Sequence, residues 1–368
     1  ASKHDVNTIY ESFNYHKYGD FKPYLIVTRD GGKTWNSIRS NLPVNNFIWT
    51  IVEDHLNPKL LFIGTEYGMF YSVNSGNSWN EFKAVPTIPI RDLEIHEDED
   101  DLIAASFGRG FYIVDDYSPI REFKRELLSK EAHLFSVKDA YQYIVASPEK
   151  SATGNNFFTS PNPTYGLKLS YYLKYDLKSR YESRQDDDNI KSSRGETINY
   201  PTTQVLEEES KEKNPKILLT IMNSKGDLIR RINADRTKGY HEKYWDLRTF
   251  SNRNIDEDNN YSGPLVPPGS YTIHLEKFDN NILSSLSDKI KFKVEQLGSK
   301  SSQADREKLF TFQVKFDKLF SKFEKLVSEI EDAIETVDGQ INKVINSSTD
   351  KDIKSLNDKK GNLMDLRL

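Results

Sequence analysis

The sequence predicts a mainly β protein in three parts: a partial β-propeller with three Asp-box-type blades, an immunoglobulin-like (Ig-like) β-sandwich, and a C-terminal α-helical hairpin. Three observations predict this architecture. An eight-residue turn motif recurs at an interval of 44 residues near the N-terminus. Short strand-like runs bounded by turn residues fill residues 166–296. Beyond residue 303 the apolar residues change to heptad spacing.

The turn motif occupies residues 28–35 and 72–79, and both copies read Ser/Thr-x-Asp/Asn-x-Gly-x-Ser/Thr-Trp. A repeat at this period is typical of propeller blades of about 40–45 residues. Its residue types indicate a turn: an acceptor for backbone N–H groups, a glycine for positive φ, and a tryptophan expected to cover each turn in an equivalent position. Because the second copy has an amide in place of the carboxylate, the role predicted for the motif is structural. The motif residues are Thr28, Asp30, Gly32 and Trp35, and Ser72, Asn74, Gly76 and Trp79.

Residues 1–118 contain three related passages, and each is predicted to form one blade. The second and third match at Gly68 and Gly110, and the third lacks the turn motif. Propellers typically need at least four blades to close. We therefore expect this sequence to be the C-terminal part of a longer protein, with further blades before Ala1.

The remaining segments follow from changes in pattern. Residues 119–165 read as a connector. About six short strands in residues 166–296 favour the Ig-like sandwich, with a charged, apolar-poor insertion at 176–214 predicted to be a mobile loop. Residues 303–368 are predicted to form a helical hairpin or coiled-coil arm. Its apolar seam consists of Leu309, Phe312, Phe316, Leu319, Phe323, Leu326, Ile330, Ile334, Val337, Ile341 and Val344.

Composition excludes several function classes. The net charge is −5 with both signs interspersed, so the basic footprint of a nucleic-acid-binding protein is absent. The chain has no cysteine, which excludes disulfides and thiolate metal sites. No run of 18 apolar residues is present, so no transmembrane segment is predicted.

The order of these motifs resembles a known family. The blades with the turn motif are followed by 108–116 (Gly-Arg-Gly-Phe-Tyr-Ile-Val-Asp-Asp), 245–248 (Trp-Asp-Leu-Arg) and 268–272 (Pro-Gly-Ser-Tyr-Thr). This order resembles the C-terminal part of bacterial BNR-repeat (Asp-box) propeller proteins that are described as glycosyl-hydrolase-like or sortilin-like. The last two segments are also similar to the Ig-like domain of flagellar hook-capping proteins. The resemblance implies an extracytoplasmic location: periplasm, outer-membrane surface or secreted.

The resemblance also points to a candidate ligand face. In such propellers the ligand face is built from loops between the second and third strands of each blade and from connections between blades. On this chain those loops carry His16, Glu66, Tyr67, Arg91 and Arg109. Sialidases use an arginine cluster with a Tyr/Glu pair, but their N-terminal arginine motif is absent here. No catalytic residue is assigned, and the alternatives of a binding surface, a catalytic face and solvated loops stay open.

Two functions are therefore expected from the sequence. The first is a non-catalytic binding or scaffold protein of the bacterial cell envelope, with a protein partner, the remainder of a larger parent chain, or a glycan as partner. The alternative is a glycoside hydrolase, sialidase-like or glucanase-like, with most catalytic residues in upstream blades. No cofactor, metal site or nucleic-acid partner is expected. The acidic run around His96 reads as a solvated loop, with weak Ca²⁺ binding as the alternative; its acids are Glu94, Glu97, Asp98, Glu99, Asp100 and Asp101.

Overall fold

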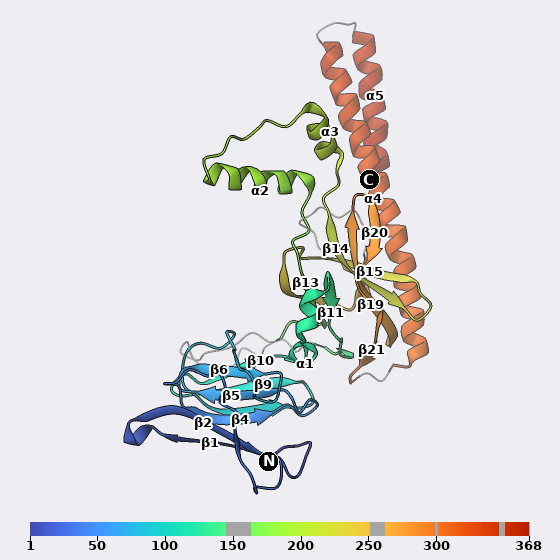
Figure 1. The fold of residues 1–368 in the computed structure, drawn as a ribbon. Helices are drawn as coiled ribbons and strands as arrows, with labels where there is room; N and C mark the ends of the chain where they lie inside the picture. Colours follow the sequence, from blue (N-terminus) through green and yellow to red (C-terminus); the bar gives the residue numbers. More distant parts are fainter. Residues whose placement is uncertain (145–162, 251–261, 299–300, 346–349, 368) are drawn as a thin grey trace. The chain divides into compact units, whose positions relative to one another are not determined.

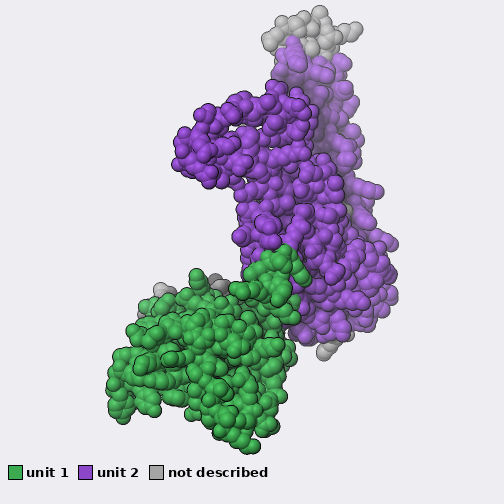
Figure 2. Space-filling model, viewed as in Figure 1, with its two compact units in different colours: residues 1–130 green, residues 131–368 purple. Residues whose placement is uncertain are grey.

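The computed structural model describes residues 1–144, 163–250, 262–298, 301–345 and 350–367. The chain divides into two compact units, unit 1 (residues 1–130) and unit 2 (residues 131–368), shown in Figure 2. The secondary structure is mainly β, with two long helices toward the C-terminus (Figure 1). The predicted class, mainly β with a C-terminal helical segment, is confirmed.

Unit 1 contains three antiparallel sheets built from consecutive strands (Figure 1). Their orders are β1-β2-β3, β4-β5-β6-β7 and β10-β9-β8. The first sheet consists of β1 (Ile9–Tyr15), β2 (Asp20–Thr28) and β3 (Asn36–Ser37), with the short 3-10 helix η1 (His16–Tyr18) between β1 and β2. The second consists of β4 (Ile48–Glu53), β5 (Leu61–Thr65), β6 (Gly68–Ser72) and β7 (Asn80–Glu81). The third consists of β8 (Ile90–His96), β9 (Asp101–Ser106) and β10 (Phe111–Val114).

The three sheets repeat one arrangement with different strands missing. Thr28 ends β2 as Ser72 ends β6, so β1, β2 and β3 correspond to β5, β6 and β7. By this alignment, residues 1–8, all of them described, supply no strand in the place that β4 takes in the second sheet. Residues 115–130 likewise supply none in the place of β7. Among the described residues, only the second sheet has all four strands.

Two apolar clusters hold the sheets together. Leu61 and Ile63 of β5 pack in a cluster with residues of the first sheet, while Phe62 packs in a cluster with residues of the third. Because β5 is buried on both faces, its sequence reads as an unbroken apolar run. Gly64 of the same strand allows close approach of the third sheet, since a Cβ there would lie 2.6 Å from the carbonyl oxygen of Ile90.

The first turn motif closes through side-chain hydrogen bonds. The backbone N–H of Gly32 donates to Thr28 Oγ1 at 2.9 Å, and the N–H of Thr34 donates to Asp30 Oδ1 at 2.9 Å. The hydroxyl of Thr34 donates to the other carboxylate oxygen at 2.7 Å. The bonds from Thr34, together with the hydroxyl of Thr28, lower the pKa of Asp30 to about 2. Asp30 therefore has the turn-forming contacts that the sequence predicts.

The second turn motif has the same contacts without a carboxylate. The N–H of Gly76 donates to Ser72 Oγ at 2.9 Å, and the N–H of Ser78 donates to Asn74 Oδ1 at 2.9 Å. The side-chain amide of Asn74 donates to Ser78 Oγ at 2.8 Å. An amide thus replaces the carboxylate with the turn intact.

The tryptophans of the two motifs lie in different environments. Trp79 is buried, and its indole N–H donates to the backbone carbonyl of Ile38, the residue after β3 of the first sheet, at 2.8 Å. Ile38 also approaches Gly76 closely, since a Cβ there would lie 2.9 Å from its side chain. Trp35 is 39% exposed, and the space at Gly32 is open. The expectation of equivalent positions is wrong in this respect, because no described sheet packs on the Trp35 side of the first sheet.

A buried ion pair joins the end of unit 1 to its sheets. The helix α1 (Pro119–Glu122) carries Arg121, whose Nε donates to both carboxylate oxygens of Asp54 at 2.8 and 2.9 Å. The hydroxyl of Tyr117 donates to the same carboxylate at 2.6 Å. Burial alone would raise the pKa of Asp54, but the hydrogen bonds from Arg121 and Tyr117 and the guanidinium charge outweigh burial and lower it. Arg121 also pairs with Asp100, and the 3-10 helix η2 (Arg125–Ser129) follows.

Unit 2 is built on two sheets that share one apolar core. One has the order β11-β13-β16 and the other β12-β21-β19-β14-β15, with β20 paired to β19. Trp245, fully buried, packs between them with Tyr271 and Phe292 at ring distances of 6.0 Å. The strands are β11 (Ala132–Leu134), β12 (Ala140–Gln142), β13 (Leu167–Leu173), β14 (Lys216–Asn223), β15 (Leu228–Ala234), β16 (Gly239–Trp245), β19 (Gly269–Asp279), β20 (Ile282–Ser285) and β21 (Ile290–Gln296), with β17 (Arg248–Phe250) and β18 (Ser262–Leu265) as a separate pair.

Two predicted boundaries differ from the structure. The connector predicted at 119–165 contains β11 and β12, which pair with β13 and β21 and belong to unit 2. These three-residue strands have no hairpin partner nearby in sequence, so the pattern did not reveal them. Residues 145–162 of the predicted connector lie outside the described residues.

The insertion predicted as a mobile loop at 176–214 contains two helices, α2 (Arg180–Ser193) and α3 (Thr203–Lys211). Helix α2 begins with a capping box between Ser179 and Glu182. Arg236 pairs with Glu182, and Arg184 of α2 pairs with Glu209 of α3. Charge pairing therefore orders a segment whose low apolar content suggested a loop.

The C-terminal helices are α4 (Gln303–Ile345) and α5 (Asp350–Arg367). Helix α5 lies alongside the C-terminal half of α4, where Val337 and Ile341 are buried (Figure 1). Residues 346–349, between the two helices, lie outside the described ranges. None of the helices in these ranges has an apolar stretch of the length that a bilayer crossing requires.

Candidate ligand-binding cleft

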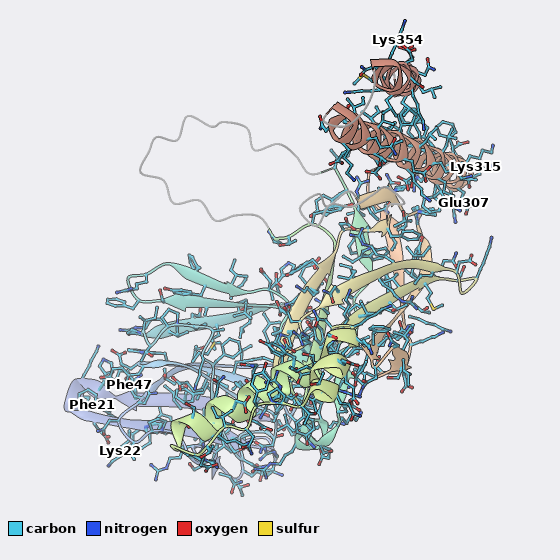
Figure 3. The ribbon with its side chains drawn as sticks, turned by 90° about the horizontal axis from the view of Figure 1, so that it is seen from above. Phe21, Lys22, Phe47, Glu307, Lys315 and Lys354 are labelled. Atoms are coloured by element: carbon cyan, nitrogen blue, oxygen red, sulfur yellow. The ribbon has the colours of Figure 1, made fainter. Side chains whose placement is uncertain are left out.

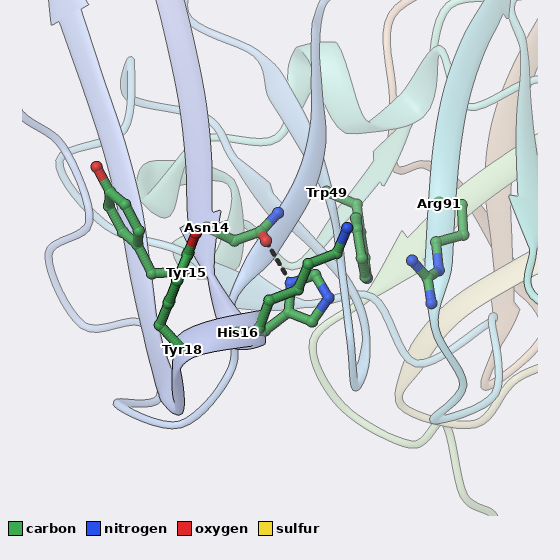
Figure 4. Close-up of a pocket in the computed structure, with 7 residues that line it drawn as sticks. Asn14, Tyr15, His16, Tyr18, Trp49 and Arg91 are labelled. Carbon is green, nitrogen blue, oxygen red and sulfur yellow. Dashed lines mark hydrogen bonds between the residues drawn. The ribbon is translucent and has the colours of Figure 1, made fainter.

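Unit 1 contains a cleft of about 450 Å³, whose lining residues are drawn in Figure 4. All three sheets contribute to it: the β1–β2 hairpin, β4 and β8. It is lined by Asn14, Tyr15, His16, Lys17, Tyr18, Trp49 and Arg91. We call these residues the cleft.

Two bulged strands supply the floor of the cleft. In β4 the pairing register shifts between Ile48 and Thr50, and in β8 it shifts between Ile90 and Asp92. The extra residue at each shift is Trp49 or Arg91. Because a bulge re-aims a side chain out of the regular alternation, these two residues leave the packed faces of their sheets. They are 42 residues apart, the offset of the repeat between the second and third sheets.

The hairpin of the first sheet supplies the wall of the cleft. Strands β1 and β2 extend well beyond the turn that joins β5 to β6, and η1 forms the tip. Gly19 closes the tip in the left-handed conformation at φ 79°, which favours glycine. His16 stacks on Phe47 with ring centroids 4.9 Å apart, which fixes the tip over the second sheet. Figure 3 labels Phe47 beside Phe21 of β2, whose ring lies 6.1 Å away.

A cation–aromatic stack organises the centre. The guanidinium carbon of Arg91 lies 3.5 Å from the ring centroid of Trp49 and 4.7 Å from that of Phe107. The indole N–H of Trp49 donates to Glu66 Oε2 at 2.9 Å. Arg91 Nε is buried and has no hydrogen-bond partner among the described residues. Leaving a buried donor unpaired costs free energy, so the Arg91 guanidinium has hydrogen-bonding capacity that the described residues do not use.

The charge of the lining is one-sided. Lys17 and Arg91 are cationic, and none of the seven residues is acidic. The side chain of His16 is held by Asn14. The exposed rings of Tyr15 and Tyr18 add flat apolar surface. The cleft is therefore suited to an anionic ligand that also has an apolar face.

The structure brings together part of the predicted ligand face. His16 and Arg91 line the cleft, and Glu66 reaches it through Trp49. Tyr67 is 56% exposed and does not line the cleft, and its backbone N–H donates to Asn46. Arg109 lies in the turn between β9 and β10, also outside the lining.

Sequence reasoning missed Trp49 and Phe107. Nothing in the strand pattern distinguishes a bulged tryptophan from one in the core. The 42-residue match between Trp49 and Arg91 was the available signal.

The acidic run near His96 does not gather into one site. Glu97 pairs with Lys3, Asp100 pairs with Arg121, and Asp101 accepts a bond from the N–H of Asp116. Within the described ranges, no group of three or more His, Asp or Glu side chains is placed to hold a metal ion. The run therefore lacks the converging ligands that the Ca²⁺ alternative requires.

Comparison with known proteins finds no matching family model and no matching curated protein. Solved structures with some similarity include PorZ, a bacterial surface component of the type-IX secretion system of Porphyromonas gingivalis (14% identity, TM-score 0.26, covering 79% of this chain and 29% of that one). A second is an ancestral GH74 enzyme (13% identity, TM-score 0.26, covering 77% of this chain and 30% of that one). A third is the extracellular domain of a putative one-component system from B. thetaiotaomicron (13% identity, TM-score 0.21, covering 74% of this chain and 28% of that one). The chain spans less than a third of the length of each, and at these TM-scores the likeness carries no argument about function.

Proposed function

We propose that this chain is a non-catalytic extracytoplasmic binding protein whose cleft takes an anionic saccharide. The observation that carries the proposal is the lining, which combines Arg91 and Lys17 with aromatic rings and contains no carboxylate. A guanidinium forms paired hydrogen bonds to a carboxylate, and aromatic rings cover the C–H face of a sugar. The extracytoplasmic setting rests on the family resemblance of the sequence.

The geometry favours binding over hydrolysis. Glycoside hydrolysis uses two carboxylates that flank the scissile bond. Glu66 accepts a bond from the indole of Trp49, and Asp92 accepts one from the N–H of Leu93. Neither lines the cleft. The glycoside hydrolase alternative therefore has no support from the described part of this cleft.

We further propose that the three sheets of unit 1 are blades of an Asp-box β-propeller. The 44-residue repeat and the matching bonds of the two turn motifs support this. The packing of Trp79 on Ile38 supports a further blade of the same repeat, from the remainder of a parent chain, on the exposed Trp35. The two sheets that share the core of unit 2 support the Ig-like sandwich.

The test is calorimetric titration of the 368-residue chain with trigalacturonate, sialyllactose and neutral cellotetraose, followed by product analysis. The proposal expects binding of an acidic saccharide, no binding of the neutral one and no cleaved product. Equal binding of the neutral sugar would refute the ionic basis, and released product would favour the hydrolase.

A further inference from the structure

Helix α4 carries an exposed apolar stripe on its N-terminal half. Its six large side chains are spaced alternately by three and four residues, the pattern of a heptad seam. Each is at least half exposed, from 50% at Phe316 to 66% at Leu319. The stripe consists of Leu309, Phe312, Phe316, Leu319, Phe323 and Leu326.

The stripe is not the face by which α4 packs on the sheets of unit 2. Another face of α4 carries Phe310, Val314 and Asp317. These residues line a cavity of about 330 Å³ together with residues of β15, β17 and β18. Asp317 is buried there. Helix α4 thus packs on the sheets with one face and leaves the stripe on another.

The stripe continues directly into the interface with α5. Positions 309, 316 and 323 are followed at the same seven-residue interval by Ile330 and Val337, and Val337 is 3% exposed under α5. Lys360 of α5 pairs with Asp338 of α4 at 2.6 Å. Because the two helices run in opposite directions and α5 ends seven residues after Lys360, α5 reaches about as far as residue 331 of α4. The seam is therefore covered by α5 at its C-terminal end, and it is uncovered from Leu326 toward the N-terminus of α4.

The uncovered part has a basic border. Lys308, Lys315 and Lys322 each precede a seam residue and form one row along the helix. Figure 3 labels Lys315 on this half of α4. Among the described residues, none of the three takes part in an ion pair of side chains within 4.0 Å. In a two-helix seam this row faces the matching row of the other helix.

We propose that the stripe from Leu309 to Leu326 is the docking site of a partner helix that lies antiparallel to α4, in line with α5. The partner presents apolar residues at heptad spacing and Asp or Glu opposite the three lysines. A second copy of this chain is a poor occupant, because antiparallel pairing of two stripes would place lysine rows face to face.

The test uses two synthetic three-heptad peptides with leucine at both seam positions, one with glutamate and one with lysine in the row that faces the lysines. Binding to the 368-residue chain is followed by fluorescence anisotropy. The Glu peptide should bind at least about tenfold more tightly than the Lys peptide. The triple variant Lys308→Glu/Lys315→Glu/Lys322→Glu should reverse this order. Lys325→Glu, an exposed lysine outside the row, is the matched control and should leave it unchanged.

The seam itself is tested by Phe316→Glu/Leu319→Glu, which should abolish binding of both peptides while circular dichroism shows the helices intact. Equal affinity for the two peptides, or no binding of either, would overturn the proposal. A dimer in light scattering that Phe316→Glu/Leu319→Glu dissociates would replace the partner helix by a second copy. Sedimentation with phosphatidylserine vesicles, lost in the same variant, would replace it by a lipid surface.

Discussion

The indole N–H of Trp79, just before β7 of the second sheet, donates to the backbone carbonyl of Ile38, just after β3 of the first, at 2.8 Å. This bond ties the turn motif of one sheet to the sheet before it. The corresponding tryptophan of the first motif, Trp35, is 39% exposed. One motif therefore stabilises an interface between sheets, and the other presents the corresponding surface.

This difference predicts unequal mutational costs. Trp79→Ala should destabilise unit 1 by about 3–5 kcal/mol, because it removes a buried ring and leaves a cavity. Trp35→Ala should cost less than about 1 kcal/mol, because the ring is partly exposed. Urea unfolding followed by circular dichroism measures both, and equal losses would contradict the assignment of the interface.

Asp30 should be replaceable by asparagine. Asn74 forms the corresponding contacts in the second motif, so Asp30→Asn should keep the thermal unfolding midpoint close to that of the wild type. Asp30→Ala removes the acceptors for Thr34 and should lower the midpoint. A larger loss with asparagine than with alanine would show that the charge, and not the turn geometry, is required.

The buried ion pair at the end of unit 1 should be strongly stabilising relative to its broken form. Asp54→Ala leaves the guanidinium of Arg121 without its main buried partner, and the expected loss is about 3–5 kcal/mol. Glu97→Gln, which breaks the exposed pair with Lys3, is the matched control and should leave the unfolding midpoint nearly unchanged. Differential scanning calorimetry distinguishes the two, and similar midpoints for both variants would contradict this account.

The order of the α2–α3 segment should depend on pH. The hydrogen bonds from Arg236 and from the N–H of Ser179 lower the pKa of Glu182 from 4.5 to about 2. A lowered carboxyl pKa stabilises the folded state above the unfolded pKa, and that stabilisation is lost as the pH falls toward 2. The difference in urea midpoint between the wild type and Glu182→Gln should therefore be largest near pH 6 and shrink toward pH 2. A constant difference across this range would exclude Glu182 as the titrating group.

Local chemistry made the turns predictable. The residue types of each motif dictate the side-chain to backbone bonds that the structure contains, and the repeat interval related two sheets before any packing was known. The heptad spacing likewise predicted a long helix at the C-terminus. These features depend on residues close together in sequence.

Long-range pairing explains what the sequence did not reveal. Strand β12 pairs in parallel with β21, more than 140 residues away, and has no local signature. Helix α2 depends on Arg236, which lies far outside the insertion. The stack of Arg91 on Trp49 arises from two bulges, and a bulge leaves no reliable mark in a strand pattern.

The central claim is that Arg91 in the cleft recognises an anionic saccharide, and the most direct measurement is the calorimetric affinity of two arginine variants for the acidic saccharide that the wild type binds. Arg91→Ala should weaken binding by about tenfold or more, the usual effect of losing a charge-assisted contact. Arg109→Ala, which removes an arginine of the predicted face outside the cleft, should leave the affinity unchanged. Arg91→Lys keeps the charge and should retain part of the binding. Equal losses for Arg91→Ala and Arg109→Ala, or unchanged binding in Arg91→Ala, would contradict the account.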